Sequence, residues 1–242
     1  IVEESQEQAI RDNLWKCVEH ISALSERTGK GLHLGLEPEP LGYFETSEET
    51  VAFFKKMRTE HPNDVRLNRH LGVNYDTCHL AVEYEEPQDA IGKIRKAGVR
   101  ISKLHLSAAL KITPSDDARA QLKQFEEDVY LHQVVERMPD GSLVRHRDLD
   151  VVLSTATEAE EWRIHFHIPL HSPDTDWFAS TRDHIDGVLD LLKADPALCT
   201  HIEMETYTWE VLPAEMKNRD VVGQLAGEYE WTLEQLRARD LA

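Results

Sequence analysis

The chain has 242 residues, of which 40% are apolar, and its 45 acidic and 27 basic side chains give a formal net charge of −18. This length and apolar content fit one α/β barrel or two smaller domains with a sizeable core. The negative charge argues against direct binding of nucleic acid or of an anionic membrane, because both need a basic protein surface.

The cysteines and the amino end bear on the compartment of the protein. Cys17, Cys78 and Cys199 are widely spaced and odd in number, which argues against a disulfide framework and predicts reduced thiols in a cytoplasmic protein. No apolar run approaches the roughly 18 residues of a membrane span, and no signal-peptide pattern opens the chain, so we expect no integral membrane segment. Because the sequence starts without methionine, we also expect that sequence upstream of Ile1 is missing.

Helical and strand-like segments alternate along the chain. An amphipathic stripe predicts a helix over residues 4–26, and a second helix is expected between the cap Thr46-Ser47 and the stop His61-Pro62. Further helices are predicted over residues 87–96, 180–193 and 221–239, and apolar runs predict strands over residues 32–37, 72–76, 101–105, 163–167 and 202–205. Alternation of this kind with short connections predicts parallel strands with helices on the outside.

Each predicted strand ends in polar residues. The ends carry Glu37 and Glu39, Asp76, His105, His165 and His167, and Glu203 and Glu205. Buried parallel strands are near-continuous apolar runs, and in a (β/α)8 barrel the chemistry lies where such strands end. A complete barrel needs eight strands, so residues 1–242 are predicted to form a single domain that is part of a TIM barrel, with about five of its strands.

Residues 107–161 interrupt the alternation and are predicted to be an insertion. Residues 129–135 and 143–147 flank the turn sequence Pro139-Asp-Gly141, which predicts a β-hairpin that turns at Asp140-Gly141. Because the insertion leaves from the end of a strand, we expect the hairpin to lie over the site as a lid. His132 would then face either the site or solvent.

The strand-end residues have the chemistry of a divalent metal site. Carboxylates and imidazoles hold Mn²⁺, Mg²⁺, Fe²⁺ or Zn²⁺, and Glu37, Asp76, His105 and Glu205 would form such a set. Alternation along a strand does not separate the members of the pairs Glu37/Glu39, His165/His167 and Glu203/Glu205. His79 follows the strand end and is expected to contact substrate or a second ion. By contrast, His20, His61, His146 and His184 are expected to be solvated surface residues.

These residues resemble the motifs of the xylose-isomerase-like TIM barrels, which include sugar isomerases, ketose 3-epimerases and endonuclease IV enzymes. The resemblance lies in Leu36-Glu37, Asp76-Thr-Cys-His79, Lys103-Leu-His105 and Met204-Glu205-Thr. It implies Glu37, Asp76, His105 and Glu205 as metal ligands and His79 as a residue on the substrate side. Where the endonuclease branch has Asp-x-His, this chain has His165-Phe-His167.

A longer resemblance is to the EboE family of metabolite traffic proteins. It is carried by Leu36-Glu-Pro-Glu-Pro40, Tyr130-Leu-His-Gln133, Trp162-Arg-Ile-His-Phe-His-Ile-Pro169 and Glu203-Met-Glu-Thr-Tyr-Thr-Trp209. The family is encoded in bacterial operons implicated in moving a secondary-metabolite precursor toward the periplasm. The resemblance implies that the chain is a carboxy-terminal portion of the barrel, with the first three strands upstream. It also implies a small-molecule metabolite as ligand and proteins of the same operon as candidate partners.

Three functions remain open from the sequence. The first is a metal-dependent isomerase or epimerase in which Glu37 and Glu205 move a proton while a metal-bound oxygen is polarised. The second is a non-catalytic protein that binds or carries a metabolite in the same metal pocket. The third is a phosphodiesterase of the endonuclease IV type, against which the charge of −18 argues. The sequence has no glycine-rich nucleotide loop and no Gly-x-Ser-x-Gly.

Overall fold

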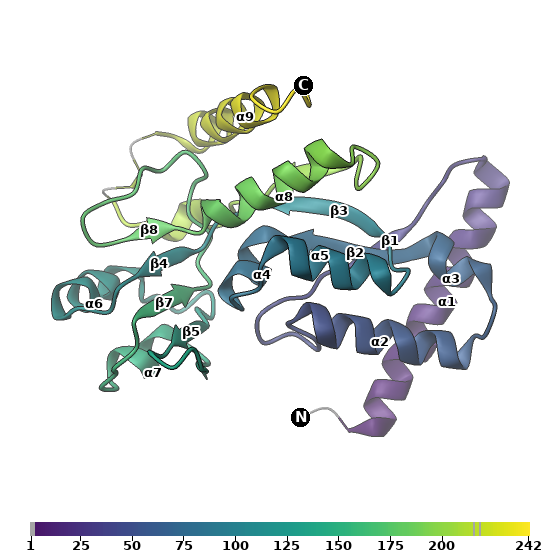
Figure 1. The fold of residues 1–242 in the computed structure, drawn as a ribbon, viewed down its shortest axis with the longest axis horizontal. Coiled ribbons are helices and arrows are strands. Elements are labelled where there is room, and N and C mark those ends of the chain that lie inside the picture. The colour runs from purple at the N-terminus through teal and green to yellow at the C-terminus, as the bar shows by residue number, and fades with distance from the viewer. Residues whose placement is uncertain (1–2, 215, 218) are drawn as a thin grey trace.

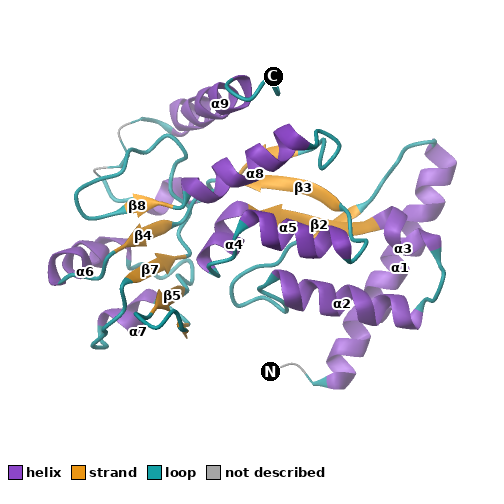
Figure 2. Cartoon of the chain, in the orientation of Figure 1, coloured by secondary structure: helices purple, strands orange, loops and turns teal. Residues whose placement is uncertain are grey.

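The structure, a computed structural model, is a mixed α/β fold with two sheets, and it describes residues 3–214, 216–217 and 219–242. A parallel sheet has the order β1 (Leu34–Leu36), β2 (Leu71–Asp76), β3 (Ile101–Leu106), β9 (Ile202–Met204). An antiparallel sheet has the order β6 (Leu143–His146), β5 (Val134–Arg137), β7 (Glu161–Ile164), β4 (Leu110–Ile112), β8 (Ala179–Ser180). The second sheet lies beyond the carboxyl end of β3, as the separate groups of orange arrows in Figure 2 show.

The helices lie around the two sheets. They are α1 (Glu4–Thr28), α2 (Ser47–Glu60), α3 (Val65–His70), α4 (Thr77–Val82), α5 (Pro87–Lys96), α6 (Asp116–Leu122), α7 (Leu149–Leu153), α8 (Arg182–Ala194) and α9 (Val221–Arg237), with short 3-10 turns η1 (Lys123–Phe125) and η2 (Thr208–Val211). In Figure 1, α2, α5 and α8 lie in a row on one side of the parallel sheet. None of the helices in the described part of the chain is both long and apolar enough to cross a membrane.

The helix ends lie where the local sequence supplies caps. The Thr46 side chain accepts a hydrogen bond from the Glu49 amide, and the Glu49 carboxylate accepts one from the Thr46 amide, which forms a capping box at the start of α2. Helix α1 ends at Gly29, whose φ of 67° is in the left-handed region that glycine adopts without strain. Pro87 is the first residue of α5, where its missing N–H costs nothing.

Four of the five predicted strand runs form the parallel sheet, so this part of the prediction is confirmed. In register, Asp76 of β2 lies opposite His105 of β3, and His105 lies opposite Glu203 of β9. All six residues of β2 are buried, as expected for a central strand covered on both faces. Within the described residues the sheet does not close on itself, because β1 and β9 are its two edges.

The remaining run, residues 163–167, was expected to be another parallel neighbour, and that prediction is wrong. β7 pairs antiparallel with β4 and β5, and β3 pairs directly with β9. Trp162 and Ile164 are buried while Arg163 is half-buried, an alternation typical of antiparallel strands that cover one face. The strand ends at Ile164, so the two histidines of this run lie in irregular chain beyond it.

The expected hairpin is present, with a shorter first strand. β5 pairs antiparallel with β6, with Val134 opposite His146, and Gly141 has a φ of 83° in the turn between them. The first strand begins at Val134, whereas a strand was expected from Val129. Residues 129–131 are exposed and belong to neither sheet.

His184 was expected at the surface, and that prediction is wrong. It lies on the buried face of α8 with 5% of its surface exposed, and its Nε2 is 3.0 Å from the hydroxyl of Tyr75 in β2. The phenol O–H donates to the neutral ring nitrogen, because burial lowers the pKa of His184 and raises that of Tyr75. The pair connects α8 to the central strand of the parallel sheet.

Candidate metal centre

The carboxyl ends of the parallel strands bring four predicted residues together. Asp76 ends β2, His105 is in β3, and Glu37 and Glu205 each follow the last residue of an edge strand. One ligand atom from each of these four residues lies within 4.8 Å of the corresponding atoms of the other three. Because strands of one parallel sheet end on the same side, residues far apart in sequence reach one point.

The nitrogen His105 Nδ1 is surrounded by carboxylate oxygens. It lies 2.8 Å from Glu205 Oε2, 3.1 Å from Glu37 Oε1 and 3.5 Å from Asp76 Oδ2. One N–H group donates to one acceptor well, and the buried oxygens Asp76 Oδ2 and Glu205 Oε2 have no hydrogen-bond partner despite their short distances. Several oxygens directed at one point without enough hydrogens fit a site that is built for a cation.

The pKa values of the cluster also indicate that its carboxylates favour a positive charge at this point. Burial alone would lower the pKa of His105, but the nearby carboxylates of Asp76, Glu205 and Glu37 favour a protonated ring and raise it to about 11. The pKa of Asp76 is held well below its usual value by His79 and His105, although burial opposes this. In the metal-free protein the imidazolium therefore carries the positive charge that the carboxylates stabilise. A divalent ion would replace that proton with two charges.

Local hydrogen bonds fix the carboxylate of Asp76. Its Oδ1 accepts hydrogen bonds from the amides of Cys78 at 2.7 Å and His79 at 3.1 Å, which cap α4, and from the hydroxyl of Ser107 at 2.5 Å. The other oxygen, Oδ2, is left free to face His105. The start of a short helix thus orients a ligand atom for the cluster.

A second group of imidazoles adjoins the first. The ring centroids of His79, His165 and His167 lie 4.8, 5.4 and 5.5 Å apart. His79 Nδ1 contacts the Pro38 carbonyl and His167 Nδ1 contacts the Glu205 carbonyl, both at 3.0 Å, so each Nδ1 carries a proton that it donates to that carbonyl. Burial lowers the pKa of His165 and His167, so both rings are neutral at pH 7.

Three further metal-type groupings involve these imidazoles. They are Asp76 with His79 and His167, Glu39 with His79 and His165, and Cys78 with His165 and His167. The Nε2 atoms of His165 and His167 are buried without a partner. Because the first grouping shares Asp76 with the four-residue cluster, the two groups are continuous.

Two other predicted residues lie outside these groupings. Glu203 is exposed and forms an ion pair with Lys103 at 2.7 Å, and its Oε2 lies 3.6 Å from His105 Nε2, on the other side of the ring from the four-residue cluster. His132 is buried against Phe166, with ring centroids 5.1 Å apart, and burial lowers its pKa. Of the pair Glu37 and Glu39, only Glu37 belongs to the four-residue cluster, whereas Glu39 belongs to the grouping with His79 and His165.

Asn74 was missed in the sequence. Its side-chain nitrogen donates to Glu37 Oε2 at 2.7 Å and lies 3.1 Å from His105 Nδ1. Asn74 is two residues before Asp76 in the same strand, so the period of two would have placed both on one face. It holds the Glu37 carboxylate in place from the neighbouring strand.

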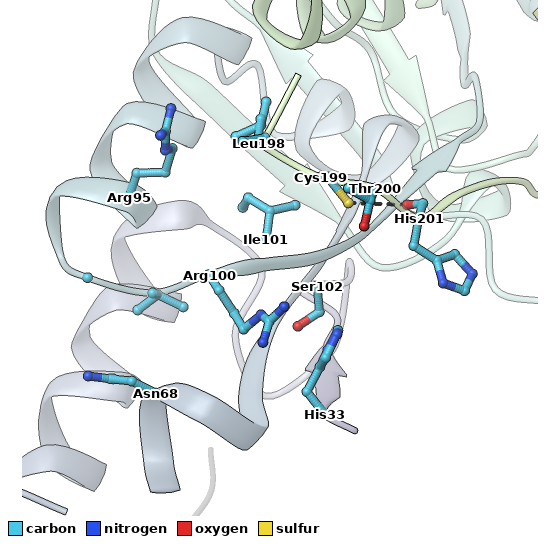
Figure 3. A pocket seen from close by; sticks show the side chains of 13 residues that line it. His33, Asn68, Arg95, Arg100, Ile101, Ser102, Leu198, Cys199, Thr200 and His201 are labelled. Carbon is cyan, nitrogen blue, oxygen red and sulfur yellow. Dashed lines mark hydrogen bonds between the residues drawn. The ribbon is translucent and has the colours of Figure 1, made fainter. Parts of the chain in front are cut away.

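A separate cavity lies at the opposite end of the parallel sheet. Its volume is about 630 Å³, and Figure 3 shows His33, Arg100 and His201 among the side chains that line it. His33 and His201 precede their strands, so the parallel arrangement places them away from the metal-type groups. None of the groupings found among the described residues includes them.

The chain matches no known family model, no curated protein and no solved structure.

Proposed function

We propose that the chain binds a divalent metal ion through Glu37, Asp76, His105 and Glu205 and acts on a small metabolite as a metal-dependent isomerase or epimerase. The observation that carries the proposal is the convergence of three carboxylates on one imidazole nitrogen, with two buried oxygens left without hydrogen-bond partners. Mn²⁺, Mg²⁺, Fe²⁺ and Zn²⁺ all accept this mixed oxygen and nitrogen donor set.

The fold and family parts of the proposal rest on the pattern of the sequence. A parallel sheet with helices on one side and polar residues at its carboxyl ends is what part of a (β/α)8 barrel presents. The resemblance to xylose-isomerase-like barrels, and to the EboE family among them, supports a role in handling a metabolite precursor. We propose that proteins of the same operon deliver or receive that metabolite.

The chemistry follows from where the carboxylates lie. A divalent ion, when bound, polarises a substrate oxygen and makes the neighbouring C–H more acidic. Glu37 and Glu205 approach from the two edge strands, and their side chains are 29% and 34% exposed, so a bound substrate can reach both. One of these carboxylates takes the proton and the other returns it on the opposite side, while Asn74 keeps Glu37 oriented.

The imidazoles beside the cluster have two roles open to them. His79, His165 and His167 either contact the substrate or, with Asp76, hold a second ion. The number of ions bound per chain distinguishes these roles, because a second ion requires two equivalents. Replacing His167 by Ala should then remove one equivalent and leave the other.

Metal binding by Asp76→Asn tests the proposal. Asparagine can keep the helix-capping hydrogen bonds of Oδ1 but loses the negative charge. Replacing a residue that only hydrogen-bonds to a metal ligand lowers metal affinity about 10–100-fold, so the loss of a ligand charge should lower the affinity for Mn²⁺ or Zn²⁺ at least as much. The metal-free variant should be less stable than the parent, because the folded protein holds the pKa of Asp76 well below its usual value and so favours the charge that asparagine lacks. The control, Glu234→Gln, alters an exposed carboxylate on α9 outside the cluster and should bind metal like the parent.

Two calorimetric results would contradict the metal assignment. One is a parent protein that binds no divalent ion at micromolar concentration, and the other is an Asp76→Asn variant that binds as tightly as the parent. If metal binds, proton transfer is measured as solvent deuterium incorporation into carbonyl compounds. Metal binding without any exchange would assign the chain to the carrier class instead.

A further inference from the structure

A small cavity opens directly beside the imidazole group. Its volume is about 360 Å³, which suits a small molecule, and its lining shares Glu39 and His165 with one of the metal-type groupings. We call this cavity the apolar mouth. Its remaining lining residues are Pro40, Leu41, Gly42, Val129, Tyr130, Leu131 and Tyr207.

Large apolar side chains are exposed around the apolar mouth. The exposed fractions are Leu41 43%, Val129 70%, Tyr130 38%, Leu131 47% and Tyr207 40%. They come from two chain segments and the loop after β9, so the exposure is not a property of one loop. Contiguous exposed apolar surface around a concavity is typical of a binding site.

An aromatic path leads from the imidazoles to the surface. The Tyr207 ring lies 4.7 Å from that of His167 and 5.0 Å from that of Tyr130, both measured between centroids. A planar group entering the apolar mouth would therefore meet aromatic rings on its way to the metal centre.

The backbone at Leu41 supports a binding role. Leu41 has a φ of 64°, in the left-handed region that branched side chains rarely adopt. The turn that holds it is closed by the Gly42 amide, which donates to the Glu39 carbonyl at 2.8 Å. Backbone of this kind is common in turns and also occurs at ligand sites, where the surrounding structure holds it in place.

We propose that the apolar mouth takes the body of the substrate, and that the substrate is a small molecule with a metal-chelating oxygen head and an aromatic or otherwise apolar body. This inference rests on the proposed function, because the metal centre would hold the head. A free sugar fits poorly, since its hydroxyls would lose their water hydrogen bonds against Leu41, Val129 and Leu131. A phosphorylated substrate also fits poorly, because none of the described residues that line the cavity is Lys or Arg.

Three hydroxamates that share one chelating head test the inference. Benzohydroxamate has an aromatic body, ribonohydroxamate a polyhydroxy body and acetohydroxamate only a methyl group. On the metal-loaded parent, benzohydroxamate should bind about 10-fold or more tighter than the other two, because only its ring gains from apolar contact.

Two variants and a matched control locate the effect. Tyr130→Ser removes an exposed ring, and Leu41→Asn replaces an apolar side chain with one that tolerates the left-handed conformation. Each should reduce the advantage of benzohydroxamate and leave acetohydroxamate binding unchanged. Tyr229→Ser, which removes an exposed ring on α9 outside the cavity lining, should change neither.

The outcomes separate this inference from the proposed function. Three results on a protein that binds metal would overturn the inference and leave the metal assignment standing. The first is that ribonohydroxamate binds as tightly as benzohydroxamate, and the second is that no hydroxamate binds. The third is that both variants still bind benzohydroxamate more tightly than the other two hydroxamates, by the same factor as the parent. If no metal binds, the proposed function fails together with the chelating head of the substrate, and 2-naphthol titrated into the metal-free protein tests whether the apolar mouth takes an apolar body. Binding that Tyr130→Ser weakens would support an apolar mouth, and no binding would overturn it.

Discussion

Acid should destabilise this fold through His184. Its pKa is about 4 in the folded protein, against an ordinary value of 6.5, because burial and then the charge of Arg163 disfavour the imidazolium. Between these two pH values the unfolded chain binds a proton that the folded chain does not, so stability rises with pH across this window. The stabilisation is complete above pH 6.5 and is lost as the pH falls toward 4.

The magnitude follows from the two pKa values. Their difference of about 2.5 corresponds to a contribution of about 3 kcal/mol to the free energy of unfolding, which is lost in full once both the folded and the unfolded chain bind the proton. About 2 kcal/mol of this contribution is lost between pH 7 and pH 5. His184→Gln keeps an acceptor for the Tyr75 hydroxyl but does not titrate in this range. The variant should therefore lose about 2 kcal/mol less than the parent between these two pH values.

Urea unfolding at pH 7 and pH 5 measures this difference. The parent, His184→Gln and a control, His20→Gln, are compared, since His20 is exposed on α1 and its replacement should leave the pH dependence unaltered. The other buried histidines remain in all three proteins, so their effects cancel in the comparison. If His184→Gln loses as much stability between pH 7 and pH 5 as the parent, the neutral buried state assigned to His184 is wrong.

Two further predictions concern packing. Gly72→Ala should destabilise the protein by about 1–3 kcal/mol in urea unfolding, because the new Cβ would lie 2.7 Å from the Arg100 carbonyl oxygen of the neighbouring strand. Gly92→Ala, at a helical position in α5 with nothing within 4 Å, should instead stabilise by about 0.5–1 kcal/mol, and a loss there would contradict the steric argument. Arg145→Met should cost about 1–3 kcal/mol and reduce hydrogen-exchange protection in β6, because it leaves the buried Glu83 carboxylate without its 2.8 Å partner, while the 42% exposure of Arg145 limits the loss. The double variant Glu83→Leu with Arg145→Met should recover most of that loss, and a double variant as unstable as the single one would show that the ion pair is not the cause.

The cluster of Glu37, Asp76, His105 and Glu205 was predictable because its members follow one structural rule. Each of Glu37, Asp76, His105 and Glu205 lies at or just past the carboxyl end of an apolar run, and parallel strands bring such ends together. The helix boundaries were predictable for a similar reason. Caps such as Thr46 and Gly29 act through hydrogen bonds and backbone angles within a few residues.

The choice between paired residues needed the tertiary structure. Glu37 and Glu39 share one face of an extended chain, as do Glu203 and Glu205, so periodicity treats the members alike. In the structure Asn74 holds Glu37, whereas Lys103 pairs with Glu203 at the surface. These partners belong to other strands, so the sequence around each glutamate carries no sign of them.

The sequence by itself determined the five longer helices, the four parallel strands and the polar residues that end those strands, whereas the short elements α3, α4, α6, α7, β4 and β8 were not predicted. The partners of residues 163–167, the exposed course of residues 129–131 and the burial of His184 were decided only by tertiary structure. An apolar run is compatible with a parallel or an antiparallel neighbour, because hydrogen bonds to a distant strand determine its direction. A histidine on a helix is buried or exposed according to which element packs on that face, and for His184 that element is the strand carrying Tyr75, 109 positions away in the chain.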